Sequence, residues 1–312
     1  MKVLKKSSFM FLFIALFALM LSACSQVNVG STSGKSASDL TPLQVLQKSA
    51  DAMKSLKSAH LDLSSNSSVQ AASTGQATTK SSPSPQALNT NVTITGSGDE
   101  VLPDQSQLNL NINAASQKSK HSEVVKGDNA YIQNAQGKWY VINKKQFNTG
   151  NNNVFSGATL DQKTLIGLIE NVKLVDHQTE TLNGVSLRHL TATLDKTALK
   201  QLLTSNPQLA SSFGGQQNLD SVLNSAKQFL AVVDVWVDEN KFYVQRTKLN
   251  LNLVIDSSFL QITTIPKVQA FIAKTSLSTT IDLSKFDQPV TITTPANATP
   301  ITDTKGLMGL GQ

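Results

Sequence analysis

The chain of 312 residues is long enough for one large domain or two ordinary ones, and its 39% hydrophobic content supports a real core. Only 15% of the residues are charged, and the net charge of +6 includes Lys2, Lys5 and Lys6 at the extreme N-terminus. Without these three lysines, 24 basic residues face 21 acidic ones. This balance is too weak to indicate nucleic-acid binding.

Residues 1–24 follow the pattern of an export signal. Three lysines precede an apolar run from Phe9 to Leu21, which at about 13 residues is shorter than the roughly 20 needed to span a bilayer. The run ends in Leu21-Ser22-Ala23-Cys24, which resembles the lipobox of bacterial lipoproteins. The resemblance implies that residues 1–23 are a cleaved signal peptide and that Cys24 carries a diacylglyceryl group. The acylated Cys24 would anchor the protein to the cell membrane on its extracytoplasmic side.

Cys24 is the only cysteine, so the fold must be stable without intramolecular disulfides. Residues 24–40 are rich in Ser, Gly and Thr and lack apolar periodicity, which is typical of a flexible tether. A helix is predicted to follow, because Thr41 and Gln44 form a capping-box pattern with proline at the first helical position. Apolar residues then recur at helical spacing, at Leu43, Leu46, Ala50 and Met53.

From Ala59 onward the apolar pattern changes to a period of two, typical of antiparallel strands with one buried and one wet face. The alternating apolar residues are Leu61, Leu63, Val92, Ile94, Leu108, Leu110 and Ile112. Residues 71–88 between the first two strands are rich in Ser, Thr and Pro and are predicted to be a disordered insertion.

Turn residues then predict three hairpins, over 123–142, over 173–195 about Asn183-Gly184, and over 232–256 with a turn at 238–240. Helices are predicted at 160–172, from Asp195 to about Leu203, and at 218–231, where the amphipathic face is cleanest. The chain is predicted to close with an edge-type strand at 281–295 and a flexible tail at 297–312.

This order of elements fits one α+β domain over residues 41–296, a strongly curved antiparallel β-sheet with helices packed on its concave face. The apolar side of such a sheet must either be sealed by the helices or enclose a space. A space lined by Leu, Val, Ile and Trp would accept acyl chains.

The element order resembles the LolA-like superfamily, and in particular the LppX/LprAFG-type bacterial lipoproteins. Besides the lipobox, the likeness is carried by AMKSLKSAHLDL (52–63), KGDNAYIQNAQGKWYVI (126–142), TLNGVSLRHLTATLD (181–195), VWVDENKFYVQRTKL (235–249) and LSKFDQPVTITTP (283–295). It covers about residues 42–295 and implies a half-barrel whose cavity binds lipid or lipidated molecules, with transfer in the cell envelope as an extension. The chain departs from the family pattern at 71–88, 218–231 and 257–276.

Two sets of residues are candidates for the ligand site. The first set is predicted to line a cavity or else to fill the core, and consists of Tyr131, Trp139, Val141, Val235, Val237, Leu249 and Leu251. The second is predicted to form a lid helix or an ordinary packed helix, and consists of Leu219, Val222, Leu223, Ala226, Phe229 and Leu230.

No catalytic, metal or cofactor site is predicted. The sequence lacks G-x-S-x-G, S-x-x-K and H-E-x-x-H, and the four histidines (His60, His121, His177 and His189) have no metal-ligand spacing. Asp234 and Asp238 are predicted to be solvated residues flanking a turn. We therefore expect a non-enzymatic monomer that binds a lipid or another amphiphile. The alternative is an envelope sensor or scaffold of the same fold that binds a protein partner.

Overall fold

The computed structural model describes residues 39–73, 88–114, 117–145, 172–205, 216, 219–256 and 271–302. The chain divides into two compact units, Met1–Lys35 and Ser36–Gln312, and every described residue belongs to the second. The predicted signal peptide, Cys24, most of the tether and nearly all of the helix predicted at 160–172 lie outside the described residues. None of the described helices is long and apolar enough to cross a membrane.

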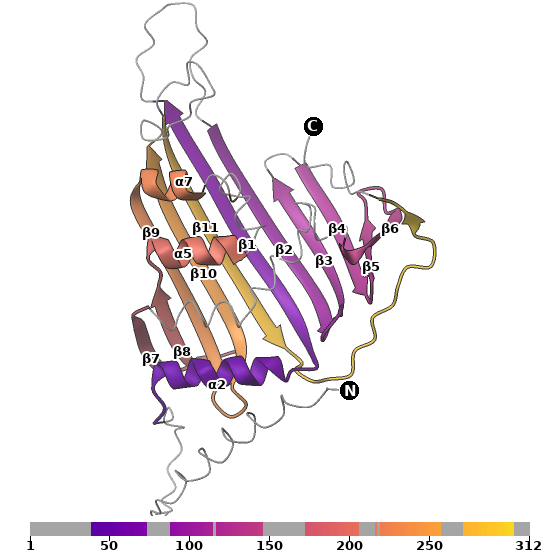
Figure 1. Cartoon of the computed structure of the whole chain (residues 1–312), viewed down its shortest axis with the longest axis horizontal. Coiled ribbons are helices and arrows are strands. Elements are labelled where there is room, and N and C mark those ends of the chain that lie inside the picture. The colour runs from indigo at the N-terminus through magenta and orange to yellow at the C-terminus, as the bar shows by residue number, and fades with distance from the viewer. Residues whose placement is uncertain are drawn as a thin grey trace, which may run out of the picture. The chain divides into compact units, whose positions relative to one another are not determined.

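Twelve strands form one open, curled sheet in the order β12-β6-β5-β4-β3-β2-β1-β11-β10-β9-β8-β7 (Figure 1). The strands are β1 (Ser58–Ser73), β2 (Leu88–Val101), β3 (Gln105–Ala114), β4 (Gln117–Lys126), β5 (Asn129–Gln133), β6 (Trp139–Asn143), β7 (Leu174–Leu182), β8 (Val185–Thr193), β9 (Ala226–Asp238), β10 (Tyr243–Asp256), β11 (Phe271–Ser284) and β12 (Thr299–Pro300). The helices are α2 (Pro42–Lys54), α5 (Lys196–Ser205) and α7 (Leu219–Ser225). Neighbouring strands are antiparallel, except that β12 runs parallel to β6.

The predicted fold class, a curved antiparallel sheet with helices on one face, is confirmed. The predicted first helix begins as expected, because the Thr41 hydroxyl accepts from the Gln44 N–H and the Gln44 side chain accepts from the Thr41 N–H. Asp195 caps α5, its carboxylate accepting from the Ala198 N–H at 2.7 Å. The three predicted hairpins are also present, as β4–β5–β6, β7–β8 and β9–β10.

The strand register gives the sheet one apolar and one polar face. Directly opposed residues of neighbouring strands point to the same face, so each face can be followed in rows. The row Leu61, Gly98, Leu108, Glu123, Ile132 and Tyr140 belongs to what we call the inner face. On the other side, the outer face, one row crosses ten strands through His189, Trp236, Arg246, Asp282, Asp62, Ser97, Asn109, Ser122, Gln133 and Trp139.

The described helices pack on the inner face of β7 to β11, and in Figure 1 α5 and α7 cross this part of the sheet. Their apolar residues join the strand residues in one buried cluster, contributing Val45, Leu46, Leu199, Leu202, Leu203, Leu219 and Leu223. Leucine is among the best helix formers and buries a large apolar surface, so these helices are stabilised mainly by this contact.

Two inner-face positions of β2 are glycines, Gly96 and Gly98, and therefore carry no side chain. A Cβ at Gly98 would lie 2.1 Å from the Gln107 carbonyl oxygen and 2.9 Å from the Leu108 Cα, so the backbone of β3 occupies that position. At Gly96 a Cβ would lie 2.2 Å from Leu110 Cδ2, so the Leu110 side chain lies flat across the strand. The inner face of β2 and β3 is therefore apolar, and at these positions its side chains extend only a short way from the sheet.

A buried arginine joins α2 to the sheet. The guanidinium of Arg188 on β8 donates to both carboxylate oxygens of Asp176, to Glu239 Oε1 at 3.2 Å and to the Leu40 carbonyl at 3.3 Å. Burial acts to raise the pKa of Asp176, but hydrogen bonds from Arg188 and from the Gln178 N–H outweigh it and lower that pKa. The ion pair therefore stabilises the point where the chain enters α2.

The helix predicted at 218–231 is wrong in its second half, because α7 ends at Ser225 and β9 begins at Ala226. The backbone of 226–232 pairs with Asn250–Ile255 of β10, a ladder that a helix could not provide. β-branched valines in the rest of β9 also favour the extended conformation. Long-range pairing therefore overrides the local helical pattern.

The predicted C-terminal edge strand at 281–295 is also wrong. β11 ends at Ser284 and is an internal strand, paired with β1 and β10. Lys285 and Asp287 have positive φ, which turns the chain out of the sheet. The segment then crosses the outer face, where Lys126 Nζ donates to the Ile292 carbonyl at 2.8 Å.

Three further boundaries differ from the sequence predictions. Residues 299 and 300 of the predicted flexible tail pair with Tyr140 and Val141 of β6. The predicted insertion 71–88 begins and ends in paired strand, at 71–73 and 88, and the rest of it lies outside the described residues. The insertion predicted at 257–276 likewise overlaps β11 from Phe271, while 257–270 lie outside the described residues.

We expect Gly98→Ala to lower the free energy of unfolding by about 1–3 kcal/mol, because the added Cβ must displace the backbone of β3. Thr95→Ala, on the exposed outer face of the same strand, should change it by less than about 0.5 kcal/mol. Urea unfolding of the domain measures both values. Equal stabilities for the two variants would contradict the close approach of β2 and β3.

We expect Asp176→Asn to cost about 2 kcal/mol at pH 7, because it leaves Arg188 buried with one charged partner fewer. Since the pKa of Asp176 is lowered in the folded state, its contribution is complete above the unfolded value of about 4 and is lost as the pH falls through the folded value. The stability difference from wild type should therefore shrink as the pH falls from about 4 toward and below the lowered pKa of Asp176. Asp51→Asn, which removes an exposed pair with Lys54, should cost less than about 0.5 kcal/mol.

Candidate functional site

The structure brings four of the seven predicted cavity residues together on the inner face. Val235 and Val237 of β9 and Leu249 and Leu251 of β10 are buried. They belong to the cluster that also contains the apolar residues of α2, α5 and α7. In this part of the sheet, helix side chains pack directly against the strands.

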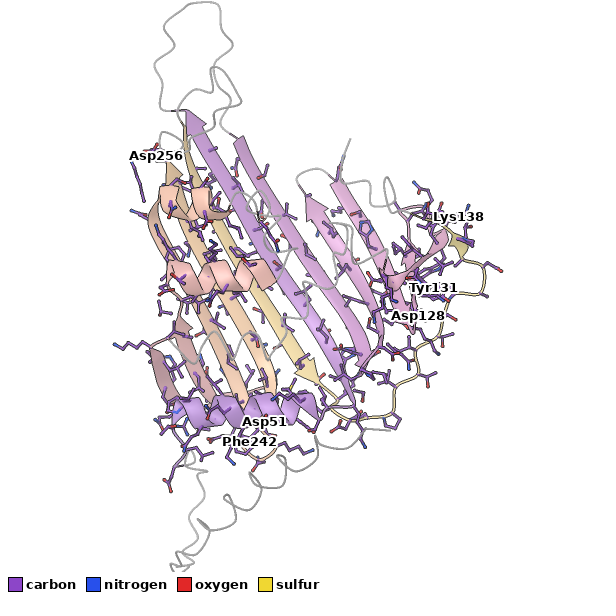
Figure 2. All side chains as sticks on the ribbon, viewed as in Figure 1. Asp51, Asp128, Tyr131, Lys138, Phe242 and Asp256 are labelled. Carbon is purple, nitrogen blue, oxygen red and sulfur yellow. The ribbon has the colours of Figure 1, made fainter. Side chains whose placement is uncertain are left out.

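The other three predicted residues do not join them. Tyr131 pairs with Val124 and Val141, which places Tyr131 and Val141 on the outer face of β5 and β6, and Trp139 shares that face. In sheet order, five strands separate β5 from β10. Figure 2 shows Tyr131 far from Phe242, which lies beside α2. The seven residues therefore do not line one common surface.

The six predicted lid residues are divided between α7 and β9. Leu219 and Leu223 are buried and Val222 is half-buried in α7, while Ala226 and Phe229 pack against the main cluster from β9. Leu230 points to the outer face and is 48% exposed, because adjacent strand residues face opposite sides. Phe229 and Leu230 therefore cannot contact a ligand on the same face of the sheet.

The inner face of β1 to β6 extends the apolar surface beyond the strands that carry the helices, and Ala130, Ile132 and Ile142 form a separate cluster there. Its buried residues are Ala59, Leu61, Leu63, Leu110, Ile112, Ala130, Ile132 and Ile142. Among the described elements, α2 and α7 make their main strand contacts with β7 and β10, and Leu61, Leu63 and Leu110 join the same buried cluster from β1 and β3. The sequence predicted these strands from their alternating pattern but did not indicate them as a ligand site. This surface is the best candidate for contact with an apolar ligand.

Three ionisable side chains interrupt this part of the inner face. Burial raises the pKa of the Glu123 carboxyl well above its usual value and also raises the pKa of Glu100. Burial lowers the pKa of the His121 imidazole. All three shifts favour the uncharged form, so an apolar ligand would meet neutral groups there.

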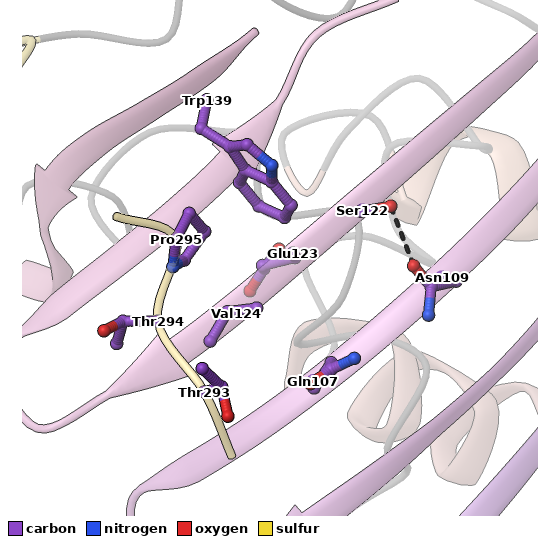
Figure 3. Close-up of a pocket in the computed structure, with 9 residues that line it drawn as sticks. All are labelled: Gln107, Asn109, Ser122, Glu123, Val124, Trp139, Thr293, Thr294 and Pro295. Carbon is purple, nitrogen blue, oxygen red and sulfur yellow. Dashed lines mark hydrogen bonds between the residues drawn. The ribbon is translucent and has the colours of Figure 1, made fainter. Parts of the chain in front are cut away.

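The outer face carries a pocket of about 250 Å³ under the C-terminal segment (Figure 3). It is lined by Gln107, Asn109, Ser122, Glu123, Val124, Trp139, Thr293, Thr294 and Pro295, of which Glu123 occupies a strand position whose side chain belongs to the inner face. The Ser122 hydroxyl of β4 donates to Asn109 Oδ1 of the neighbouring strand β3 at 2.8 Å. With the indole of Trp139 and several amide and hydroxyl groups, the pocket is suited to a polar ligand with an apolar part.

Sequence reasoning missed a stack of rings on the outer face of β7, β8 and β9. His177 and His189 stack at 4.4 Å between ring centroids, and His189 stacks on Trp236 at 4.2 Å. Glu180 Oε2 lies 2.9 Å from both His189 Nδ1 and Trp236 Nε1. No group of residues in the described parts of the chain is arranged to hold a metal ion.

No protein-family model matches the chain, and no curated protein matches it. Among solved structures, it is similar to LprF from Mycobacterium bovis, with 18% identity and a TM-score of 0.43, over 84% of this chain and 100% of that chain. It is also similar to the lipoprotein LppX from Mycobacterium tuberculosis, with 15% identity and a TM-score of 0.38, over 80% of this chain and 97% of that one.

Proposed function

We propose that this protein is a membrane-anchored lipoprotein that binds a lipid or another amphiphile, without catalysis, against the inner face of its curled sheet. The observation that carries the proposal is the largely apolar inner face of β1 to β4, which includes Leu61, Leu63, Leu108 and Leu110. Acyl chains in contact with this surface would leave water at about 25 cal/mol for each Å² buried.

The thinness of β2 supports the same proposal. Because Gly96 and Gly98 carry no side chains and Leu110 lies across Gly96, this part of the inner face is apolar and has little side-chain volume. The main strand contacts of α2 and α7 are with β7 and β10, and Leu61, Leu63 and Leu110 join the same buried cluster from β1 and β3. The ligand would therefore contact β1 to β4, and Val235, Val237, Leu249 and Leu251 would support the site from the packed side.

Anchoring is the second part of the proposal and depends on the lipobox at residues 21–24. Two or three acyl chains at Cys24 would hold the protein on the membrane, since a single chain binds only marginally. A monomer held in this way could accept lipid from the membrane and could also pass it on within the envelope.

The purified domain without residues 1–24 should contain lipid that native mass spectrometry and organic extraction both detect. It should also bind a fluorescent fatty acid with saturation. The absence of both extracted lipid and saturable binding would rule out the proposed function.

Leu108→Trp should weaken fatty-acid binding at least about fivefold, because the indole would fill space over Gly98 on the inner face. Asn111→Trp adds the same ring to the exposed outer face of β3 and should leave binding unchanged. Titration of both variants, after circular dichroism has shown equal folding, measures the effect. Equal binding by the two variants would place the ligand elsewhere.

Cys24→Ser should release the full-length protein from the membrane fraction and leave its signal peptide uncleaved, because the sulfur that accepts the diacylglyceryl group is missing. Fractionation and mass spectrometry of the N-terminus measure the two effects. Ser25→Ala is the matched control and should remain in the membrane fraction. Membrane retention of Cys24→Ser with unchanged mass would contradict lipidation.

The outer-face pocket favours a second candidate function, an envelope sensor or scaffold that binds a protein partner. Its mixture of Trp139, hydroxyls and amides is typical of surfaces that bind peptide segments. In that case a lipid-free domain would capture one stoichiometric envelope protein, and Trp139→Ala would abolish the capture. Leu108→Trp should have no effect on it.

A further inference from the structure

Two buried polar atoms on β4 have no hydrogen-bond partner. Glu123 is 4% exposed and His121 is 2% exposed, yet Glu123 Oε2 and His121 Nδ1 form no hydrogen bond. Buried polar groups in proteins are nearly always satisfied, because an unpaired one keeps the cost of leaving water without compensation. These two atoms therefore require an explanation.

Glu123 and His121 lie two residues apart on the inner face of the same strand, about 7 Å apart along it. The residues directly opposite them on β3 are Leu108 and Leu110, and Ile132 on β5 faces Glu123. The pair is thus one polar spot inside the apolar surface that we propose for the ligand. A core built only for stability would have apolar residues at both positions.

The chemistry of the pair favours uncharged partners. Burial raises the pKa of Glu123 and lowers the pKa of His121, so both favour their neutral forms. His121 Nε2 already lies 3.1 Å from the Ser119 hydroxyl, which leaves Nδ1 to donate or accept according to the tautomer. A neutral carboxylic acid likewise both donates and accepts.

The described inner-face strand positions around the pair carry no positive charge. Among the described residues, the inner-face positions of β1 to β6 include no lysine or arginine, because Lys118, Lys120 and Lys126 all belong to the outer face. An anionic headgroup would therefore be buried without a counter-charge, which is strongly unfavourable. A hydroxyl group, which donates and accepts, matches both unpaired atoms.

We propose that Glu123 and His121 bind the hydroxyl groups of an uncharged amphiphile of the acylglycerol class, while its acyl chain contacts the apolar inner face. This inference rests on the proposed lipid-binding function and names the ligand class for the same site. The ligand would supply the hydrogen bonds that the two side chains lack.

The test compares three probes with the same chain, namely 1-monooleoylglycerol, methyl oleate and oleate, by isothermal titration to the domain without residues 1–24. Wild type should bind monooleoylglycerol on the order of tenfold more tightly than methyl oleate, the difference expected for one or two buried hydrogen bonds. Oleate should bind more weakly than monooleoylglycerol at pH 8, where it is charged.

Glu123→Leu should abolish the preference for monooleoylglycerol, keep the affinity for methyl oleate, and raise the melting temperature of the ligand-free domain. Glu123→Gln should retain the preference, because an amide both donates and accepts. Lys120→Leu, at an exposed outer-face position of the same strand, should alter neither binding nor preference.

Equal binding of the two neutral probes by wild type, or a preference that survives Glu123→Leu, would overturn the assignment of the polar pair while leaving lipid binding in place. Tighter binding of oleate would overturn the uncharged class. Failure of wild type to bind any of the three probes would overturn the proposed function and this inference with it.

Discussion

The strand register is the constraint on which the rest of the structure depends. In a sheet of twelve strands, a slip of one residue in any pair would move an entire strand's apolar side chains to the polar side. Leu61 and Leu63 on β1 remain in line with Leu108 and Leu110 on β3 through the two glycines of β2. The separation of faces thus fixes both where the helices pack and where a ligand would lie.

The buried polar groups of the inner face differ in whether their hydrogen bonds are satisfied. At the α2 end, Arg188 is held by Asp176 and Glu239, and its hydrogen bond to Leu40 makes the cluster part of the fold. Glu123 and His121, on the other half of the sheet, have atoms without partners. The first arrangement stabilises the domain, whereas the second weakens it, as we expect of groups whose hydrogen bonds a ligand would supply.

Local sequence patterns predicted the elements whose signals are local, and failed where distant pairing decided the outcome. The capping box at Thr41 and Gln44, the Asn183-Gly184 turn and the alternation in β3 were all predicted from the sequence. Ala226–Leu230 has helical spacing but forms strand, because β10 supplies a partner ladder. Similarly, an ideal two-residue turn would place His189 opposite Gln178; the bulge at Gln178, with φ of 64°, brings His177 beside it instead.

The two edges of the sheet explain why it can stay open. An unprotected edge invites pairing with another chain. The β6 edge is covered by Thr299 and Pro300, and proline offers no N–H for a further strand. At the other edge, the bulge in β7 interrupts the ladder. With both edges blunted, the sheet does not need to close on itself to avoid association, so the apolar inner face and the more polar outer face stay distinct across an open sheet.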